Sequence, residues 1–388
     1  MESSKENKIN GINESPDERS LDFARDDIKA KNIWTKKNDK PLLVLAPMAG
    51  YTDAAFRLLC REFGADIVVT ELISADAIAY GKIRNQKSEI RIDKEVLTFN
   101  RCAAGKNKNT AELLSFFEEE RPLMIQLFGK YPEKFAKAAK WVSDNLKPDG
   151  IDINMGCPAR KVVGSDHGAA LLKNCDLAEE IVRSVKANTD LPVSVKTRLG
   201  WENDDEILEF APRLQKAGID AIIIHGRTYK DGFKGQARWE NVYKIKNLLN
   251  IPVIANGDVK GIDDKIIRTA NCQLQTANLD GVAIGRAAFG KPWIFQEKSK
   301  VKSQKSQDWW PFHGRAANNN LTIDKEFLSG VISRHAELEW GTKGERGIIE
   351  LRKHLVKYLS GFENSKALRI QAVQVKTLED VKGLLEKF

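Results

Sequence analysis

The sequence predicts a (β/α)8 TIM barrel followed by a small all-helical domain. Eight short apolar runs alternate with longer amphipathic stretches, and most runs lie roughly 25 to 40 residues apart, the length of one strand, one helix and two loops. Nearly every run also ends in a polar residue or a glycine. A closed barrel gathers the carboxyl ends of its strands on one face, whereas an open sheet spreads them along a line, so this pattern favours the barrel.

The eight runs are Leu42–Pro47, Asp66–Glu71, Leu123–Phe128, Gly150–Asn154, Leu191–Arg198, Asp220–Gly226, Ile251–Asp258 and Asp280–Arg286. Residues 41–298 are expected to form the barrel domain. The polar stretch between Gly81 and Asn109 lengthens the second connection.

The remaining segments are expected to differ in kind from the barrel. Residues 1–40 are rich in Lys, Asp, Glu, Asn and Ser, which predicts a disordered or extended segment. Residues 299–320 have the composition of a linker. In residues 321–388, the stretch IIELRKHLVKYLSGF carries apolar residues at three- and four-residue spacing, which predicts a helical domain.

The composition excludes several classes of protein. The five cysteines, Cys60, Cys102, Cys157, Cys175 and Cys272, have no CxxC spacing, so neither a disulfide framework nor a metal site is expected. No apolar run approaches the roughly 18 to 20 residues that span a bilayer, and the polar N-terminus lacks a signal core. We expect a cytoplasmic protein without membrane contact. The net charge of +8 permits a polyanionic partner without requiring one.

The Cys157-Pro158 step in NMGCPARKVV directly follows the fourth run. A thiol at the carboxyl end of a barrel strand lies where such folds place their chemistry. Cysteine beside proline is also common in ordinary buried turns, so the dipeptide alone leaves both interpretations open.

The last two runs carry a predicted phosphate site. Asn256, Gly257 and Asp258 end the seventh run, and Gly285 and Arg286 end the eighth. Glycine lets backbone N–H groups approach an oxyanion, and arginine adds a fork of donors.

Three other strand-end side chains have open assignments. Lys196 needs an anionic partner at the mouth, which would be a cofactor ring, a phosphate or a neighbouring carboxylate. His225 either donates to phosphate or substrate, or is merely hydrogen-bonded at its strand end. Gln126 offers a donor and an acceptor that suit the edge of a heterocycle.

Seven motifs together carry a family resemblance: LAPMAGYTDAAFR, RPLMIQLFG, DINMGCPARKVVGSDHGAALLK, VSVKTRLGW, IIHGRTYKDGFKGQARW, IPVIANGD and VAIGRAAFGKPWIF. In this order and spacing the chain resembles the tRNA-dihydrouridine synthases, and the bacterial DusB-like branch most of all. The similarity runs from about Leu43 to Phe295 and resumes at RKHLVKYLSGF. It implies an FMN-binding barrel that reduces the C5–C6 double bond of selected uridines in tRNA, with NADPH as the usual electron donor.

The resemblance also implies roles for individual residues. It sets the backbone of Pro47, Met48 and Ala49 along the flavin, and Gln126 and Lys196 on the pyrimidine edge. The residues it assigns to the ribityl phosphate region are His225, Asn256, Gly257, Asp258, Gly285 and Arg286.

The resemblance further implies that Cys157 is the general acid and that Asn154 lies near the substrate base. The implied reaction adds a hydride at C6 and a proton at C5. A thiol with an ordinary pKa of about 8.5 stays protonated near neutrality yet gives up its proton readily.

A uridine in folded tRNA must be turned out of its stack, and the binding energy for this comes from contacts to the phosphate backbone. The candidates for these contacts are Arg160, Lys161, Arg198, Arg352, Lys353, His354 and Lys357. For any one of them, an ordinary solvated surface is the alternative. We expect the protein to act as a monomer.

Two other functions remain open from the sequence. A flavin barrel acting on a small pyrimidine, as in relatives of dihydroorotate dehydrogenase, would share the phosphate site but would not need a basic helical domain. The other alternative is a tRNA-binding protein that keeps the fold without catalysis, and absence of a bound flavin would separate it from the two enzymes.

Overall fold

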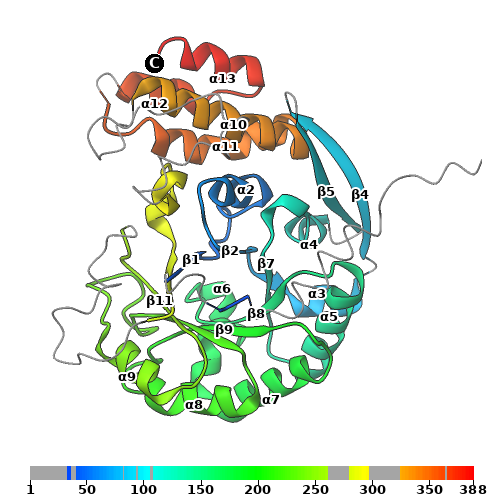
Figure 1. Ribbon diagram of the computed structural model, residues 1–388, viewed down its shortest axis with the longest axis vertical. Helices are drawn as coiled ribbons and strands as arrows, with labels where there is room; N and C mark the ends of the chain where they lie inside the picture. The colour runs from blue at the N-terminus through cyan, green and yellow to red at the C-terminus, as the bar shows by residue number, and fades with distance from the viewer. Residues whose placement is uncertain are drawn as a thin grey trace, which may run out of the picture.

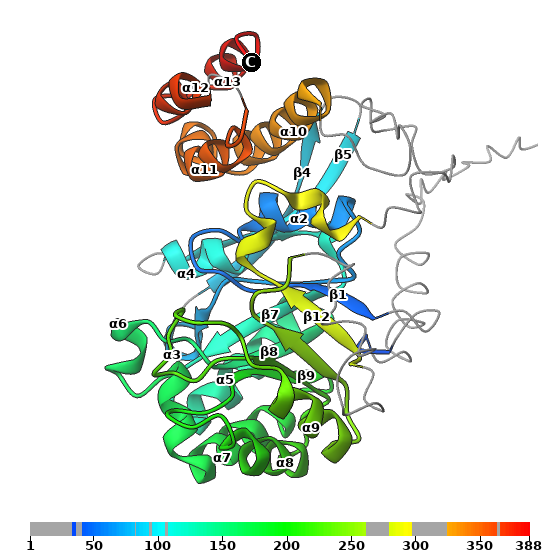
Figure 2. The ribbon, with the colours of Figure 1, turned by 90° about the vertical axis from the view of Figure 1, so that its left-hand side faces the viewer.

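The computed structural model describes residues 33–35, 41–81, 83–92, 95–104, 108–260, 279–296, 324–362 and 365–388. Eight parallel strands form a closed barrel, shown in Figures 1 and 2. They are β1 (Leu42–Leu45), β2 (Ile67–Val69), β7 (Leu123–Phe128), β8 (Gly150–Met155), β9 (Val193–Arg198), β10 (Ala221–His225), β11 (Val253–Asn256) and β12 (Gly281–Ile284). Strand β1 pairs with both β2 and β12, and β2 pairs with β7, which closes the ring. Seven of the eight predicted runs contain one of these strands, and the run Gly150–Asn154 covers all of β8 except Met155, so the predicted barrel is confirmed.

The alternation of side chains within the strands explains the two layers of the barrel core. In β1, Leu42 and Val44 belong to the inner cluster, and Leu43 and Leu45 pack with the surrounding helices. This two-residue period is that of any strand, whose successive side chains point to opposite faces. Helices cover the outside (Figure 1): α2 (Ala54–Glu62), α3 (Ala75–Tyr80), α5 (Pro132–Asn145), α7 (Cys175–Lys186), α8 (Ile207–Ala217) and α9 (Glu240–Leu248).

Trp34 departs from the prediction for residues 1–40. Its side chain is 1% exposed and belongs to the inner cluster of the barrel, together with Leu42, Met124 and Ala221. Because these three residues lie at or near the starts of their strands, Trp34 closes the amino-terminal end of the barrel. A disordered or extended segment is therefore the wrong description at this residue, since burial of an indole outweighs the polar composition around it. The rest of residues 1–40 lies outside the described residues.

The polar stretch after the second strand contains a β-hairpin. Strands β4 (Ile83–Ile92) and β5 (Glu95–Ala104) pair antiparallel, and β6 (Phe116–Phe117) extends this small sheet. Ile90, Ile92 and Leu97 pack with Leu338 of the helical domain. The buried positions are separated by charged and amide residues, so only tertiary packing distinguishes this segment from a loop. The helices α4 (Lys108–Leu113) and α6 (Arg160–Val163) and strand β3 (Ile73–Ser74) are further short elements of the barrel connections.

The described residues of the C-terminal domain form four helices, α10 (Lys325–Lys343), α11 (Glu345–Tyr358), α12 (Ser365–Ala372) and α13 (Leu378–Leu385), which confirms its predicted helical character. Its core includes Leu59 of α2 and Phe63, the residue that follows α2, so the domain packs directly on the barrel (Figure 1). The predicted linker, residues 299–320, lies outside the described residues. Within the described part of the chain, none of the helices has the length and apolar character needed to cross a membrane.

Candidate active site

A cavity of about 720 Å³ opens at the carboxyl ends of the barrel strands. All eleven residues predicted to contact the cofactor line it: Pro47, Met48, Ala49, Gln126, Lys196, His225, Asn256, Gly257, Asp258, Gly285 and Arg286. Asn154, Cys157 and Arg198 line the same cavity. With Leu72, which follows β2, all eight strands or the loops after them contribute residues to this one site, as the barrel topology requires.

A chain of hydrogen bonds fixes the amide side chains at the floor of the cavity. The backbone N–H of Cys157 donates to Oδ1 of Asn154 at 3.0 Å, so the amide nitrogen of Asn154 must face the other way. That nitrogen donates to Oε1 of Gln126 at 2.8 Å, and Nε2 of Gln126 donates to Oδ2 of Asp152 at 2.7 Å. Each amide can take only one orientation in this chain, because a backbone N–H begins it and a carboxylate ends it.

Asp152 is a site residue that the sequence analysis did not single out. It is fully buried, and the hydroxyl of Ser194 donates to its second carboxylate oxygen. Burial raises the pKa of Asp152 to about 6. The aspartate between two isoleucines in GIDIN could have indicated this role. A carboxylate on an inward-facing strand position requires polar partners inside the barrel.

Lys196 has a different partner from those considered for it. Its ammonium donates to Oδ1 of Asn256 at 2.9 Å, and the amide nitrogen of Asn256 donates to the carbonyl oxygen of Ala283 at 2.7 Å. Burial, with a smaller effect of the Arg198 charge, lowers the pKa of Lys196 to about 8. An anionic ligand in the cavity would offset the free-energy cost of burying the charged ammonium group of Lys196.

Positive groups gather where the phosphate site was predicted. Arg286 is 57% exposed and lies 3.8 Å from the carboxylate of Asp258, which also accepts from Arg227 at 2.6 Å. Arg227 was not predicted as a cofactor residue, and its guanidinium also donates to the carbonyl oxygens of Lys234 and Gly235. Burial and the surrounding cations lower the pKa of His225 to about 2, so its ring is neutral.

Gly257 is required by its backbone and by its close neighbour. Its φ is +106°, and a Cβ atom there would lie 2.6 Å from Cδ2 of His225. Only glycine leaves this turn open beside the histidine ring.

Cys157 is half-buried and its backbone is held on both sides. Besides its N–H bond to Asn154, its carbonyl oxygen accepts from the N–H of Ala169 at 3.1 Å. Gly168, with φ of +61°, packs beneath it, and a Cβ there would lie 3.0 Å from that carbonyl oxygen. The position of the thiol at the cavity is therefore set by the strand end and by the segment after α6.

Two of the predicted RNA contacts are buried, and for His354 the structure contradicts the prediction. Arg198 is 2% exposed, and its guanidinium donates to the carbonyl oxygens of Gly156, Thr228 and Gly232, so it braces the loops around the cavity. His354 is fully buried among aromatic rings of α10, α11 and the barrel loops. Helical spacing alone did not show that His354 lies on the apolar face of α11.

The other RNA candidates occupy varied positions. Arg160 and Lys161 are exposed on α6, directly after Cys157, and Lys357 is exposed on α11. Lys353 lies 5.4 Å from the ring centre of Tyr51. Arg352 uses its donors on the carbonyl oxygens of Val375 and Gln374.

Three aromatic residues of the cavity wall were also missed. Tyr51 stacks on Phe289 with ring centres 3.9 Å apart, and Phe233, which is 57% exposed, lies under the guanidinium of Arg286 at 4.9 Å. All three follow strand ends by several residues, so the sequence shows no run that marks them.

Comparison with protein families gives one match that spans nearly all of the described chain. Residues 44–388 match the model of the family "Dihydrouridine synthase (Dus)". The chain belongs to the dihydrouridine synthase family. The match includes the C-terminal helices, so barrel and helical domain both belong to the family's shared architecture.

Individual relatives agree with this membership. A probable tRNA-dihydrouridine synthase 1 of Synechocystis sp. is 34% identical over 364 residues, which cover 92% of this chain and 90% of the relative. A probable tRNA-dihydrouridine synthase of Aquifex aeolicus is 34% identical, covering 89% of this chain and 95% of the relative. The tRNA-dihydrouridine synthase B of Pseudomonas syringae pv. tomato is 38% identical over 256 residues, covering 66% and 67%.

Proposed function

We propose that this dihydrouridine synthase reduces the C5–C6 double bond of specific uridines in tRNA, with FMN in the barrel cavity, NADPH as electron donor and Cys157 as proton donor. The observation that carries the proposal is the convergence of the eleven predicted cofactor residues and Cys157 on one cavity. A tRNA substrate agrees with the predicted cytoplasmic location, and NADPH rests on the family resemblance.

The cavity has the donors that FMN would need. Arg286 and the open backbone at Gly257 would hold the phosphate, where the pair of glycine turn and guanidinium suits an oxyanion. Gln126 and Lys196 would meet the pyrimidine edge of the ring, and the backbone of residues 47–49 would lie along it. Nε2 of Gln126 has a second hydrogen beyond the one that it gives to Asp152, which leaves one donor for the ring.

The chemistry that FMN would supply when bound is a hydride for C6 of the uracil ring. Cys157 would give its thiol proton to C5, so that one hydride and one proton complete the reduction. The second N–H of Asn154 is available to hold the base beside the thiol, because its first donates to Gln126. Arg160 and Lys161 would contact the RNA backbone beside the flipped base.

The proposal is tested in a strain that lacks its own dihydrouridine synthases. Expression of this chain should restore dihydrouridine at defined tRNA positions, read by mass spectrometry, and the purified protein should be yellow. A yellow protein that restores none, and instead reduces a free pyrimidine, would favour the small-substrate enzyme. A colourless protein that binds tRNA without reducing it would favour the non-catalytic alternative.

Gly257→Ala should weaken FMN binding by at least about tenfold, because the new methyl group clashes with His225 at a backbone conformation that alanine rarely adopts. Titration of the flavin-depleted protein with FMN measures this. Gly232→Ala is the matched control, since Gly232 also has a positive φ of +59° but has nothing within 4 Å of its Cβ position. Equal FMN affinity in the two variants would contradict the phosphate site at Gly257.

Asp152→Ala should lower kcat/KM for tRNA by about 10- to 100-fold, because Gln126 and Ser194 lose a buried acceptor worth about 1–3 kcal/mol. Asp152→Asn should fall between this variant and the wild type, since the Ser194 hydroxyl can turn to accept from the new amide. Single-turnover reduction of tRNA, at matched flavin content, reports the loss. If Asp152→Ala reduces tRNA at the wild-type rate, the hydrogen-bond chain does not position the site.

A further inference from the structure

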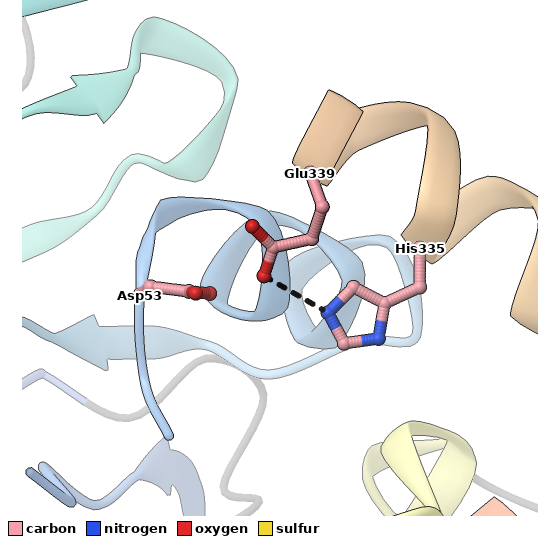
Figure 3. A group of neighbouring side chains, drawn as sticks. All are labelled: Asp53, His335 and Glu339. Carbon is pink, nitrogen blue, oxygen red and sulfur yellow. Dashed lines mark ion pairs between the residues drawn. The ribbon is translucent and has the colours of Figure 1, made fainter. Parts of the chain in front are cut away.

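A cluster of three potential metal ligands lies at the junction of the barrel and the helical domain (Figure 3). Asp53 immediately precedes α2, and His335 and Glu339 lie one turn apart on α10. One ligand atom from each lies within 4.8 Å of the other two. The three side chains come from segments almost 300 residues apart in sequence and point toward one another (Figure 3).

The two atoms at the centre of this cluster are Nε2 of His335 and Oε1 of Glu339. Both are completely buried, and among the described residues neither is paired with an N–H or hydroxyl group. The carboxyl groups of Asp53 and Glu339 share a hydrogen bond, so a cation would take the place of that shared proton. Nε2 of His335 and Oε1 of Glu339 are 3.8 Å apart, which is too long for a hydrogen bond. Two ligands held about 2.1 Å from one ion, at an angle of about 110–130°, lie about 3.4–3.8 Å apart. The gap therefore fits a shared cation.

The other polar atoms of these three side chains all have hydrogen-bond partners. Nδ1 of His335 lies 3.0 Å from the hydroxyl of Tyr358, and Lys343 donates to Oε2 of Glu339 at 3.0 Å. The carboxylate of Asp53 accepts from Lys343 at 2.6 Å and from the backbone N–H of Phe56 at 3.1 Å. Metal ligands are typically oriented by such outer hydrogen bonds, so this pattern aims the free atoms of His335 and Glu339 at one point.

The charges also leave room for a cation. Lys343 pairs with three carboxylates, those of Asp53, Glu339 and Glu350, and Glu350 also pairs with Arg346. Asp53 and Glu339 therefore share the one ammonium group of Lys343.

We propose that Asp53, His335 and Glu339 bind one divalent transition-metal ion, of which Zn²⁺ is the natural probe, at this junction. One imidazole nitrogen and two carboxylate oxygens form a ligand set suited to Zn²⁺, with a water as the fourth ligand. The ion would join the loop before α2 to the helical domain. Asp53 follows Tyr51 of the cavity wall by two residues. The bound ion would therefore connect the helical domain to the mouth of the active site.

The test uses the full-length protein as purified, stripped with EDTA, dialysed and then titrated with ZnCl₂ against a chromogenic zinc chelator. The wild type should bind one Zn²⁺ per chain. His335→Gln and Glu339→Gln should weaken that binding by about 100-fold or more, since loss of an outer partner alone costs 10- to 100-fold. Glu350→Gln is the matched control, because it bonds the same Lys343 without facing the cluster, and it should bind Zn²⁺ within about threefold of the wild type.

Thermal unfolding distinguishes a variant that has lost a metal ligand from one that is only less stable. Zn²⁺ should raise the melting temperature of the wild type and of Glu350→Gln, and EDTA should reverse the rise, because a ligand of the folded state alone stabilises it. His335→Gln should show no such response at any starting stability. Absence of stoichiometric Zn²⁺ in the wild type would overturn the proposal, as would equal affinity in the wild type and the two ligand variants.

Discussion

Replacing Cys157 by alanine should reduce the rate of tRNA reduction by about 10²- to 10⁴-fold, the usual contribution of a positioned general acid. FMN content and NADPH oxidation without tRNA should stay close to the wild-type values. The thiol is the proposed proton source, whereas the cavity donors for the flavin, Arg286, Lys196 and Gln126, come from other strands. The backbone bonds of residue 157 to Asn154 and Ala169 do not involve the thiol, so alanine leaves the loop in place.

Single-turnover reduction of tRNA by the pre-reduced enzyme, followed by mass spectrometry of the nucleosides, measures this loss. Cys175→Ala is the matched control, because Cys175 is also a half-buried free thiol but begins α7 and does not line the cavity. It should keep wild-type activity. Full turnover by Cys157→Ala would remove Cys157 from the mechanism.

Trp34→Ala should lower the free energy of unfolding by about 3–5 kcal/mol, the range for removing a large aromatic side chain from a core. Trp34 is 1% exposed and packs with Leu42, Met124 and Ala221 inside the barrel, so its removal leaves a cavity the size of an indole. An opening at this end would also let water reach the inner core. Chemical denaturation followed by circular dichroism reports the change.

Two variants make the Trp34 result specific. Trp34→Phe should recover more than half of the loss, because it keeps an aromatic ring in the same space. Trp340→Ala, at a tryptophan that is 38% exposed on α10, should cost much less. If Trp34→Ala and Trp340→Ala change stability equally, Trp34 does not close the barrel.

The sequence predicts the place of a site residue well where that place depends on one strand alone. Lys196, His225 and Asn256 each end an apolar run, and a strand end on the inward face of a barrel must lie at the mouth, so their place in the cavity followed from position alone. The same reasoning identified Gly257, whose neighbour His225 explains why the turn needs glycine.

Signals that depend on a neighbour from another element were missed or misread. Arg198 lines the cavity as its strand-end position predicts, but only the fold shows that three backbone carbonyl oxygens of other loops accept from its guanidinium. His354 was misassigned because one helical face cannot be told from the other until α10 and the barrel loops are packed against it. The hairpin β4–β5 is only a polar stretch in the sequence, because its apolar residues gain their partners in other elements, among them α2 and α10.

The sequence by itself determined the barrel, its eight strands, the helical C-terminal domain and most residues of the cavity. These follow from short-range patterns: the two-residue alternation in strands, the spacing of helices, and polar residues at strand ends. Only the tertiary structure decided that Trp34 enters the barrel core, that Asp152 anchors the amides beneath Cys157, and that Asp53 meets His335 and Glu339. Each of these contacts joins residues distant in sequence, and burial in a shared interior, which no local pattern encodes, sets their energies and their partners.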